Sequence, residues 1–152
     1  MKTWWTPVSN AIAAHGPGGY VVVFPSYRPD LAEEMANALS CAFIDFRREK
    51  MAPLGMSAHR LDLAEIIGCA DETAGTAGIV LHNAEALLAA RSADIRRDFC
   101  AGFLAAPRTN IAILPLALFG QDMADHPRVI RLESDSLPAE TMLRQLASMR
   151  FQ

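Results

Sequence analysis

Two short stretches of the sequence carry residues that could bind a phosphate group. The first is PSYRPD, residues 25–30, which follows an apolar run and leads into a helical pattern. A phosphate-binding loop needs glycines for close backbone approach, free N–H groups, a lysine and a hydroxyl for magnesium. Here Arg28 could replace the lysine as a charge, but the two prolines have no N–H and Asp30 is anionic. We therefore expect an ordinary strand-to-helix turn, with Pro29 in the first helical turn, and keep Ser26 and Arg28 as candidate ligand-binding residues.

The second stretch is HNAE, residues 82–85, which ends the apolar run GIVLH. In parallel α/β sheets the ligand site lies beyond the carboxyl ends of the strands. His82, Asn83 and Glu85 stand at such an end, so they complete the set of candidate ligand-binding residues. The four histidines of the chain are scattered and lie at no metal-ligand spacing with cysteine or carboxylate, so no metal site is predicted.

A third group of residues could contact a protein partner. Arg96, Arg97 and Arg108 belong to the densest basic group of the chain, which either forms a solvated helix face or contacts an anion or a partner. Trp4 and Trp5 either cover an edge of the sheet or form an exposed anchor of the kind that carries binding energy. The sequence leaves both alternatives open.

Composition narrows the class of protein. The chain has 152 residues, of which 51% are hydrophobic and 20% charged, so it can form one α/β domain with its own core. A net charge of −3 argues against binding to nucleic acid or to an anionic membrane through overall charge. The three cysteines form no CxxC pair, which argues against a disulfide framework or a structural zinc. With no signal-peptide pattern and no apolar run of about 18 residues, we expect a cytoplasmic protein.

Apolar runs alternate with helical patterns along the chain, and no hairpin dipeptides join the runs. This order predicts a three-layer α/β sandwich around a mostly parallel five-stranded sheet. Asn83 and Ser92 are predicted helix caps, and Gly68 the end of a helix around 58–68. We expect an N-terminal extension at 1–19, a core at 20–133 and a C-terminal segment at 134–152 with a helix over 139–149. The predicted strands lie at 20–24, 41–46, 78–82, within 110–119, and at 128–132.

The order of these segments resembles a P-loop ATPase of the AAA+ and related type over roughly residues 18–133. LHNAEALL is similar to the end of the family's Walker B strand, with His82 where aspartate is expected, and residues 99–119 resemble the next helix and sensor strand. The length and the same strand ending also resemble the small P-loop component of BREX-type phage-defence systems. The resemblance implies a sheet ordered 5-1-4-3-2, with the strand within 110–119 at its centre. A receiver-like order, 2-1-3-4-5, would contradict it.

The sequence departs from that family at the groups that perform phosphoryl transfer. The first turn lacks the glycines, the lysine and the magnesium hydroxyl, and His82 is a poor ligand for a hard cation. The helical lid that closes over adenine in the AAA+ type is also missing after the fifth strand. Because phosphoryl transfer depends on positioning and charge stabilisation, we expect no ATPase activity and no bound ATP or magnesium.

The expected function is therefore that of a non-catalytic P-loop-like adaptor or regulatory subunit. It would act by protein–protein binding, within an assembly or a homo-oligomer, in a bacterial defence or DNA-transaction complex. In the families that it resembles, one subunit can supply an arginine to its neighbour's phosphates, and Arg96, Arg97 and Arg108 are the candidates for that role. The alternative is an α/β regulatory module that binds a nucleotide or another small anionic ligand through Ser26, Arg28 and Glu85.

Overall fold

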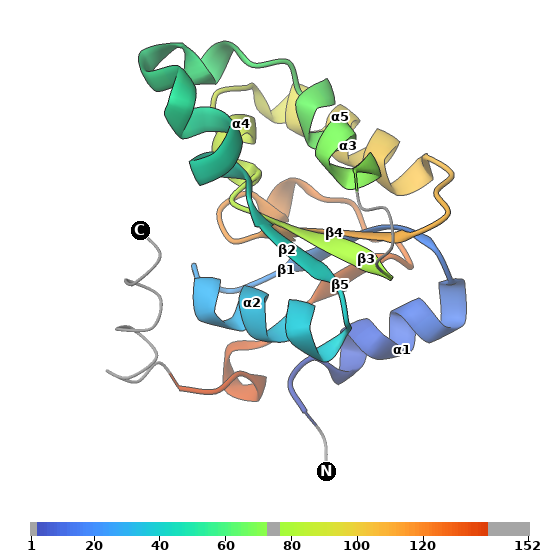
Figure 1. Cartoon of the computed structure of the whole chain (residues 1–152). Coiled ribbons are helices and arrows are strands. Elements are labelled where there is room, and N and C mark those ends of the chain that lie inside the picture. The colour runs from blue at the N-terminus through green and yellow to red at the C-terminus, as the bar shows by residue number, and fades with distance from the viewer. Residues whose placement is uncertain (1–2, 73–76, 140–152) are drawn as a thin grey trace.

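The computed structural model describes residues 3–72 and 77–139 (Figure 1). Its centre is a five-stranded sheet in the order β2-β3-β4-β1-β5, and every pair of neighbouring strands is parallel. The expected order, 5-1-4-3-2, is this order written from the other edge, so that prediction is confirmed. The strands are β1 Gly18–Val23, β2 Ala42–Asp45, β3 Gly78–His82, β4 Ile111–Leu116 and β5 Val129–Arg131.

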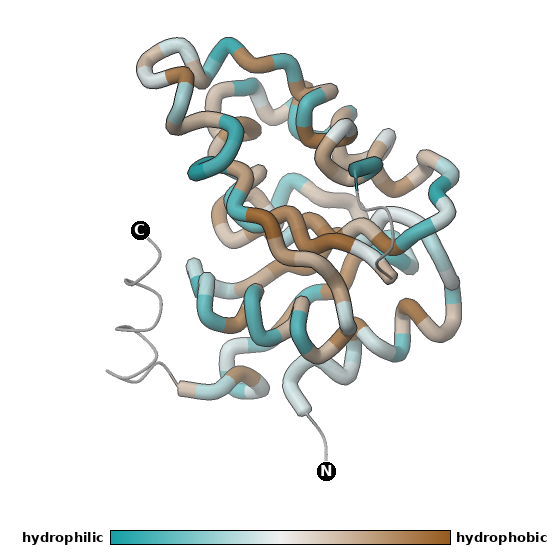
Figure 2. Tube along the Cα trace, viewed as in Figure 1, coloured by the Kyte–Doolittle hydropathy of each residue, from teal (hydrophilic) through white to brown (hydrophobic). Residues whose placement is uncertain are grey.

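Helices cover both faces of the sheet and make the expected three-layer sandwich (Figure 1). One face is covered by α1 (Thr6–His15) and α2 (Pro29–Ala38), and the other by α3 (Ala64–Asp71), α4 (Glu85–Leu88) and α5 (Ala93–Ala105). The strands are the most continuously hydrophobic part of the trace in Figure 2, because both of their faces are buried. None of the helices in the two described ranges is long and apolar enough to cross a membrane.

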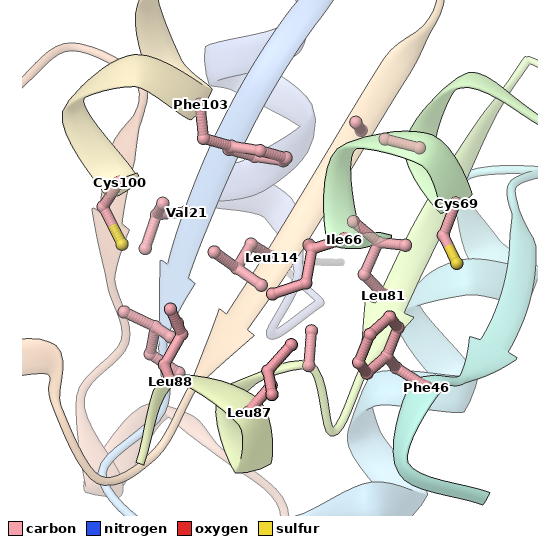
Figure 3. Close-up of a cluster of buried hydrophobic side chains, with 14 of the residues drawn as sticks. Val21, Phe46, Ile66, Cys69, Leu81, Leu87, Leu88, Cys100, Phe103 and Leu114 are labelled. Carbon is pink, nitrogen blue, oxygen red and sulfur yellow. The ribbon is translucent and has the colours of Figure 1, made fainter. Parts of the chain in front are cut away.

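Each helical layer packs its own apolar cluster against the sheet. Figure 3 shows one cluster, in which Ile66, Leu87 and Phe103 from the three helices converge on Leu81 and Leu114 of the strands. The opposite cluster includes Trp4, Val8 and Met35 with strand residues. Trp4 and Val8, from the predicted N-terminal extension, are thus packed against the sheet. Two clusters joined through one central sheet explain why this chain folds as a single layered unit.

β4 lies at the centre of the sheet, as expected from its almost unbroken apolar character. It pairs with β1 along its whole length, up to Val23↔Leu116. Its pairing with β3 stops earlier, at Val80↔Ile113. Pro115, which has no N–H to donate, follows this last pair and is compatible with a strand that no longer pairs on that side. Beyond Val80 and Ile113, the last residues of β3 and β4 therefore do not pair with one another.

Several local predictions are confirmed by the structure. Pro29 begins α2, where its missing N–H costs nothing, and Asp30 lies in the first turn. Ser92 caps α5, and its hydroxyl accepts a hydrogen bond from the backbone N–H of Ile95 at 3.4 Å. β1 begins at Gly18, two residues before the predicted strand. A side chain at Gly19 would stand 2.4 Å from the carbonyl oxygen of Phe103, so glycine lets α5 approach the strand.

Three local predictions are wrong. Asn83 does not cap a helix, because it has a positive φ of 63° and α4 begins two residues later with Ala84 at its cap position. Gly68 does not end a helix, because α3 runs through it to Asp71 and buries Cys69 and Ala70 beyond it. The helix predicted around 58–68 is divided between two elements, since the backbone at Leu61 is extended.

Residues 47–60 form helical turns that stand out from the helical layer at the upper left of Figure 1. They are η1 (Arg47–Met51) and η2 (Ala52–Arg60), and Gly55 with φ 56° kinks the second. Two further short turns, η3 (Gly120–Asp122) and η4 (Ser134–Ser136), follow β4 and β5. The helix predicted over 139–149 lies, beyond Ala139, outside the described residues.

Candidate functional site

A cleft lies beyond the carboxyl ends of β1, β3 and β4. All five candidate ligand-binding residues border it, because these strands carry them to the same edge of the sheet. The cavity volume is about 30 Å³, against the 300–1,000 Å³ that is typical of small-molecule sites. The lining residues are Phe24, Ser26, Tyr27, Arg28, Ala32, His82, Asn83, Glu85, Pro115, Leu116 and Ala117.

Arg28 lines the cleft, but its guanidinium is bonded within the chain. Nε and Nη2 each donate to the Asp30 carboxylate at 3.1 Å, and Nη1 donates to the carbonyl oxygen of Pro138 at 2.9 Å. The side chain is only 6% exposed. Arg28 therefore ties the start of α2 to the segment after β5, and its charge is compensated by Asp30.

Glu85 is likewise committed to internal hydrogen bonds. Its two carboxylate oxygens accept from the backbone N–H groups of Ala117, Leu118 and Phe119 at 2.8, 2.9 and 2.9 Å. Consecutive N–H groups that point to one place form a binding site for an anion. The buried Glu85 carboxylate is itself the anion at this place, and it holds the loop that leaves β4.

His82 is buried in a stack of three rings. Its imidazole lies between the rings of Tyr27 and Phe43, with centroids 5.7 and 5.3 Å away. Its Nε2 is 3.3 Å from the hydroxyl of Tyr27. Burial lowers the pKa of His82 below its usual value of 6.5, and the charge of Asp45 opposes this shift. The ring is therefore neutral at neutral pH and serves as a packing surface beneath Tyr27.

Asn83 and Ser26 complete the border of the cleft. Asn83 donates from Nδ2 to Oδ1 of Asp45 at 3.1 Å, and the backbone N–H of Arg48 donates to the same oxygen at 3.1 Å. The ends of β2 and β3 are thus joined by side-chain contacts. Ser26 lies in the turn after β1 and is exposed to solvent at the edge of the cleft.

The three candidate partner-binding arginines do not come together. Arg96 bonds to Asp122 at 2.9 Å, and its guanidinium lies 4.0 Å from the centre of the Phe119 ring. Arg97 is exposed and pairs with Asp94 one turn away on α5. Both belong to α5, whereas Arg108 follows this helix and precedes β4, at the edge of the sheet opposite the cleft.

Arg108 is held by a salt bridge of 2.7 Å to Asp71, at the end of α3, and its side chain is 6% exposed. Its guanidinium also lies 5.1 Å from the centre of the Phe103 ring. Within the described residues, Nε and Nη2 of Arg108 are buried and have no hydrogen-bond partner.

The two tryptophans pack at the N-terminal end of the domain. Trp4 is 7% exposed, stacks edge-on against Trp5 and Phe24, and donates from Nε1 to a carboxylate oxygen of Glu34 at 3.1 Å. Trp5 is half-buried beside it. This arrangement favours the packing interpretation of the pair over that of an exposed anchor, most clearly for Trp4.

Two exposed apolar residues near the cleft are not among the candidate residues predicted from the sequence. Tyr27 is 52% exposed and Leu118 is 63% exposed, and they follow the adjacent strands β1 and β4. The signal in the sequence is weak, because Tyr27 stands alone in a polar turn and Leu118 lies in an apolar run that also suits a buried residue. Their exposure is decided by the backbone of the two turns, which places their side chains outward.

Comparisons with known proteins do not assign this chain to a family. No protein-family model, no curated protein and no solved structure matches the chain. Within the described residues, no group of three or more histidine, cysteine, aspartate or glutamate side chains could hold a metal ion.

Proposed function

We propose that this protein is a non-catalytic domain of P-loop-like architecture that acts by binding another protein. The observation that carries the proposal is the position of Glu85. A glutamate after the third strand would activate water in an ATPase of the family that the sequence resembles, but here both carboxylate oxygens accept backbone hydrogen bonds from residues 117–119. To act as a base or to approach a magnesium ion, this carboxylate would have to release the loop after β4.

The other polar residues at the cleft support the same proposal. Arg28 has each of its three guanidinium nitrogens in a hydrogen bond, so an incoming phosphate would compete with Asp30 and with the Pro138 carbonyl. His82 borders the cleft, but its ring is buried and stacks on Tyr27 and Phe43. Two large apolar side chains, Tyr27 and Leu118, are exposed near the cleft. An exposed tyrosine is among the residue types that contribute most to protein interfaces, and an exposed leucine adds apolar surface that a partner can bury.

A second function is favoured by one observation. Ser26, Arg28 and Glu85 border the same cleft, so a small anionic ligand such as a nucleotide would meet all three. The internal bonds of Arg28 and Glu85 and the small volume of the cleft argue against this alternative. A nucleotide would have to open the cleft before it could bind.

Calorimetry separates these two functions. We expect no micromolar binding of ATP with magnesium, and no release of phosphate in a turnover assay. Micromolar binding that is lost in Arg28→Ala, and kept in Arg97→Ala as a control at an exposed arginine, would instead establish the ligand-binding function. The Arg28→Ala chain needs a circular dichroism spectrum like that of the wild type, because Arg28 also stabilises the fold.

The protein partner can be sought among the products of the adjacent genes. A bacterial defence or DNA-transaction complex is the setting that we propose for it, following the resemblance of the sequence. Co-expression and light scattering should yield a complex that Leu118→Ala weakens and Met56→Ala, an exposed apolar site elsewhere, leaves intact. A chain that neither self-associates nor forms any complex with these products would contradict the proposed function.

A further inference from the structure

We infer that the protruding segment at residues 47–60 binds the surface of an anionic lipid membrane, with Leu54 and Met56 entering the headgroup layer beside basic side chains. This activity goes beyond the proposed protein-binding function and uses a different part of the domain. Three features of the described residues carry it. They are an exposed apolar tip, a concentration of positive charge beside that tip, and a base that is fixed to the domain.

The tip of the segment, residues 52–57, belongs to η2 and is exposed at every position. Met56 is 93% exposed and Leu54 is 46% exposed, and the chain kinks between them at Gly55. No residue of the tip is charged, and Ser57 alone has a polar side chain. Because the segment stands out from the helical layer (Figure 1), these apolar side chains project from the domain into solvent.

Positive charge is concentrated on both sides of this tip in the sequence. The segment contains four cationic residues, Arg47, Arg48, Lys50 and Arg60, and one anionic residue, Glu49, so its net charge is +3. Since the whole chain carries −3, the remainder carries −6. An anionic surface attracts the segment and repels the rest of the molecule, so the charge distribution favours the orientation in which the tip meets that surface.

The cations of the segment are accessible to lipid headgroups. Arg47 and Arg60 are exposed, and neither has an ion pair with another described residue. Lys50 lies 3.9 Å from Glu72, in a pair whose side chains are 35% and 65% exposed. Exposed ion pairs contribute little, so a lipid phosphate can replace the Glu72 carboxylate.

The base of the segment is fixed to the domain at both ends. Phe46, which immediately precedes it, is fully buried in the cluster that Figure 3 shows, and Met51 packs against the same cluster. After the tip, Arg91 donates from Nη1 to the carbonyl oxygen of His59 at 2.8 Å. A fixed base limits the conformational freedom that is lost when the tip binds.

The composition of the tip favours a lipid surface over other anionic partners. Proteins that bind single-stranded nucleic acid add aromatic rings that stack on bases, and residues 52–57 include no aromatic residue. A protein partner is recognised through hydrogen bonds as well as apolar contacts, and Ser57 is the only side chain of the tip that offers them. A bilayer needs neither, because it takes up apolar side chains at the headgroup boundary and attracts basic ones without a fixed register.

The test is co-sedimentation of the full chain with vesicles at about 0.1 M salt. We expect binding to phosphatidylcholine vesicles that contain phosphatidylserine, and none to vesicles of phosphatidylcholine alone. Leu54→Ala/Met56→Ala should bind the mixed vesicles at least about 10-fold more weakly, because the apolar contact is lost. Arg47→Gln/Arg60→Gln should also weaken binding about 10-fold or more, since each basic residue near the surface contributes roughly fivefold.

Variants outside the segment are matched controls. Ile95→Ala removes an apolar side chain that is 47% exposed, and Arg97→Gln removes an exposed positive charge. Each should change vesicle binding by less than about twofold. Lipids with brominated acyl chains should quench the fluorescence added by Met56→Trp, but not that of Trp4 and Trp5, which pack on the opposite face of the sheet. This quenching separates entry of the tip into the bilayer from adsorption by charge alone.

Three results would overturn the inference. They are a chain that does not bind the mixed vesicles, binding that is unchanged in Leu54→Ala/Met56→Ala, and bound Met56→Trp whose added fluorescence is not quenched. A segment that binds duplex DNA or an acidic protein, but no vesicles, would equally overturn the lipid activity. The proposed function is tested separately, since its protein complex depends on Leu118 and not on Met56. Circular dichroism of each variant distinguishes a lost contact from a lost fold.

Discussion

Glu85 accepts a hydrogen bond of 2.9 Å from the backbone N–H of Leu118, whose side chain is 63% exposed. One residue is buried and charged, the other exposed and apolar, and 33 positions separate them in the sequence. Through this contact a candidate ligand-binding residue supports the loop that carries an exposed apolar side chain. The relationship connects the internal hydrogen bonds of Glu85 with the surface that we propose for binding.

The first prediction concerns the contribution of Glu85 to stability. Glu85→Gln keeps one acceptor oxygen but turns an NH₂ group toward N–H donors of residues 117–119, so two donors would face one another. We expect the free energy of unfolding to fall by about 1.5–3 kcal/mol, the range for hydrogen bonds to a charged group. Urea denaturation followed by circular dichroism measures it. Glu133→Gln, at an exposed glutamate, should change the unfolding free energy by less than about 0.5 kcal/mol.

If Glu85→Gln were as stable as the wild type, the Glu85 carboxylate would not be the group that holds the loop. The role of Glu85 as the support of the loop that carries Leu118 would then lose its basis. Hydrogen exchange at the backbone amides of residues 117–119 gives an independent reading, since these amides should exchange faster in the variant.

The second prediction concerns the pH dependence of stability through His82. Burial lowers the pKa of this histidine in the folded protein below its usual 6.5, while the unfolded chain keeps the usual value. The unfolded chain therefore binds more protons as the pH falls through about 6.5, and stability is lost in that direction. The contribution is fully present above about pH 6.5 and decreases by at most roughly 1.4 kcal/mol per pH unit below it, down to the folded pKa.

His82→Phe keeps a ring between Tyr27 and Phe43 but cannot be protonated. The loss of unfolding free energy between about pH 7.5 and about pH 5.5 should be smaller in this variant than in the wild type. His59→Asn, at an exposed histidine, should retain the wild-type slope. Equal slopes in the wild type and His82→Phe would show that His82 is not kept neutral by its surroundings.

The third prediction contrasts two glycines. A methyl group on Gly19 would stand 2.4 Å from the Phe103 carbonyl oxygen, whereas one on Gly102 would meet nothing within 4 Å. Gly19→Ala should therefore destabilise the protein by about 1–3 kcal/mol or more, because α5 has to move away from β1. Gly102→Ala, inside the same helix, should stabilise it by about 0.5–1 kcal/mol through better helix propensity. Both variants add one methyl group, and thermal unfolding measures the effect of each. A Gly19→Ala chain as stable as the Gly102→Ala chain would contradict the close packing of α5 against β1.

Part of this structure was predictable because its causes are local. The run GIVLH is a strand at the predicted bounds, since five successive residues suit burial on both faces. Ser92 caps a helix because its hydroxyl reaches an N–H only three residues away. The order of the strands came from the resemblance of the segments to P-loop proteins, not from any periodicity, and it was confirmed.

The sequence by itself thus determined the α/β class, the strands and the turn at Pro29, because hydrophobic runs, caps and proline geometry act over a few residues. Only the tertiary structure decided the roles of Glu85, Arg28 and Trp4, since their partners lie far along the chain or in other layers. It also decided that Gly68 lies inside α3, where the burial of Cys69 and Ala70 outweighs the low helix propensity of glycine. A side chain's chemistry depends on what occupies its hydrogen bonds, and that is settled by contacts between segments that the sequence keeps apart.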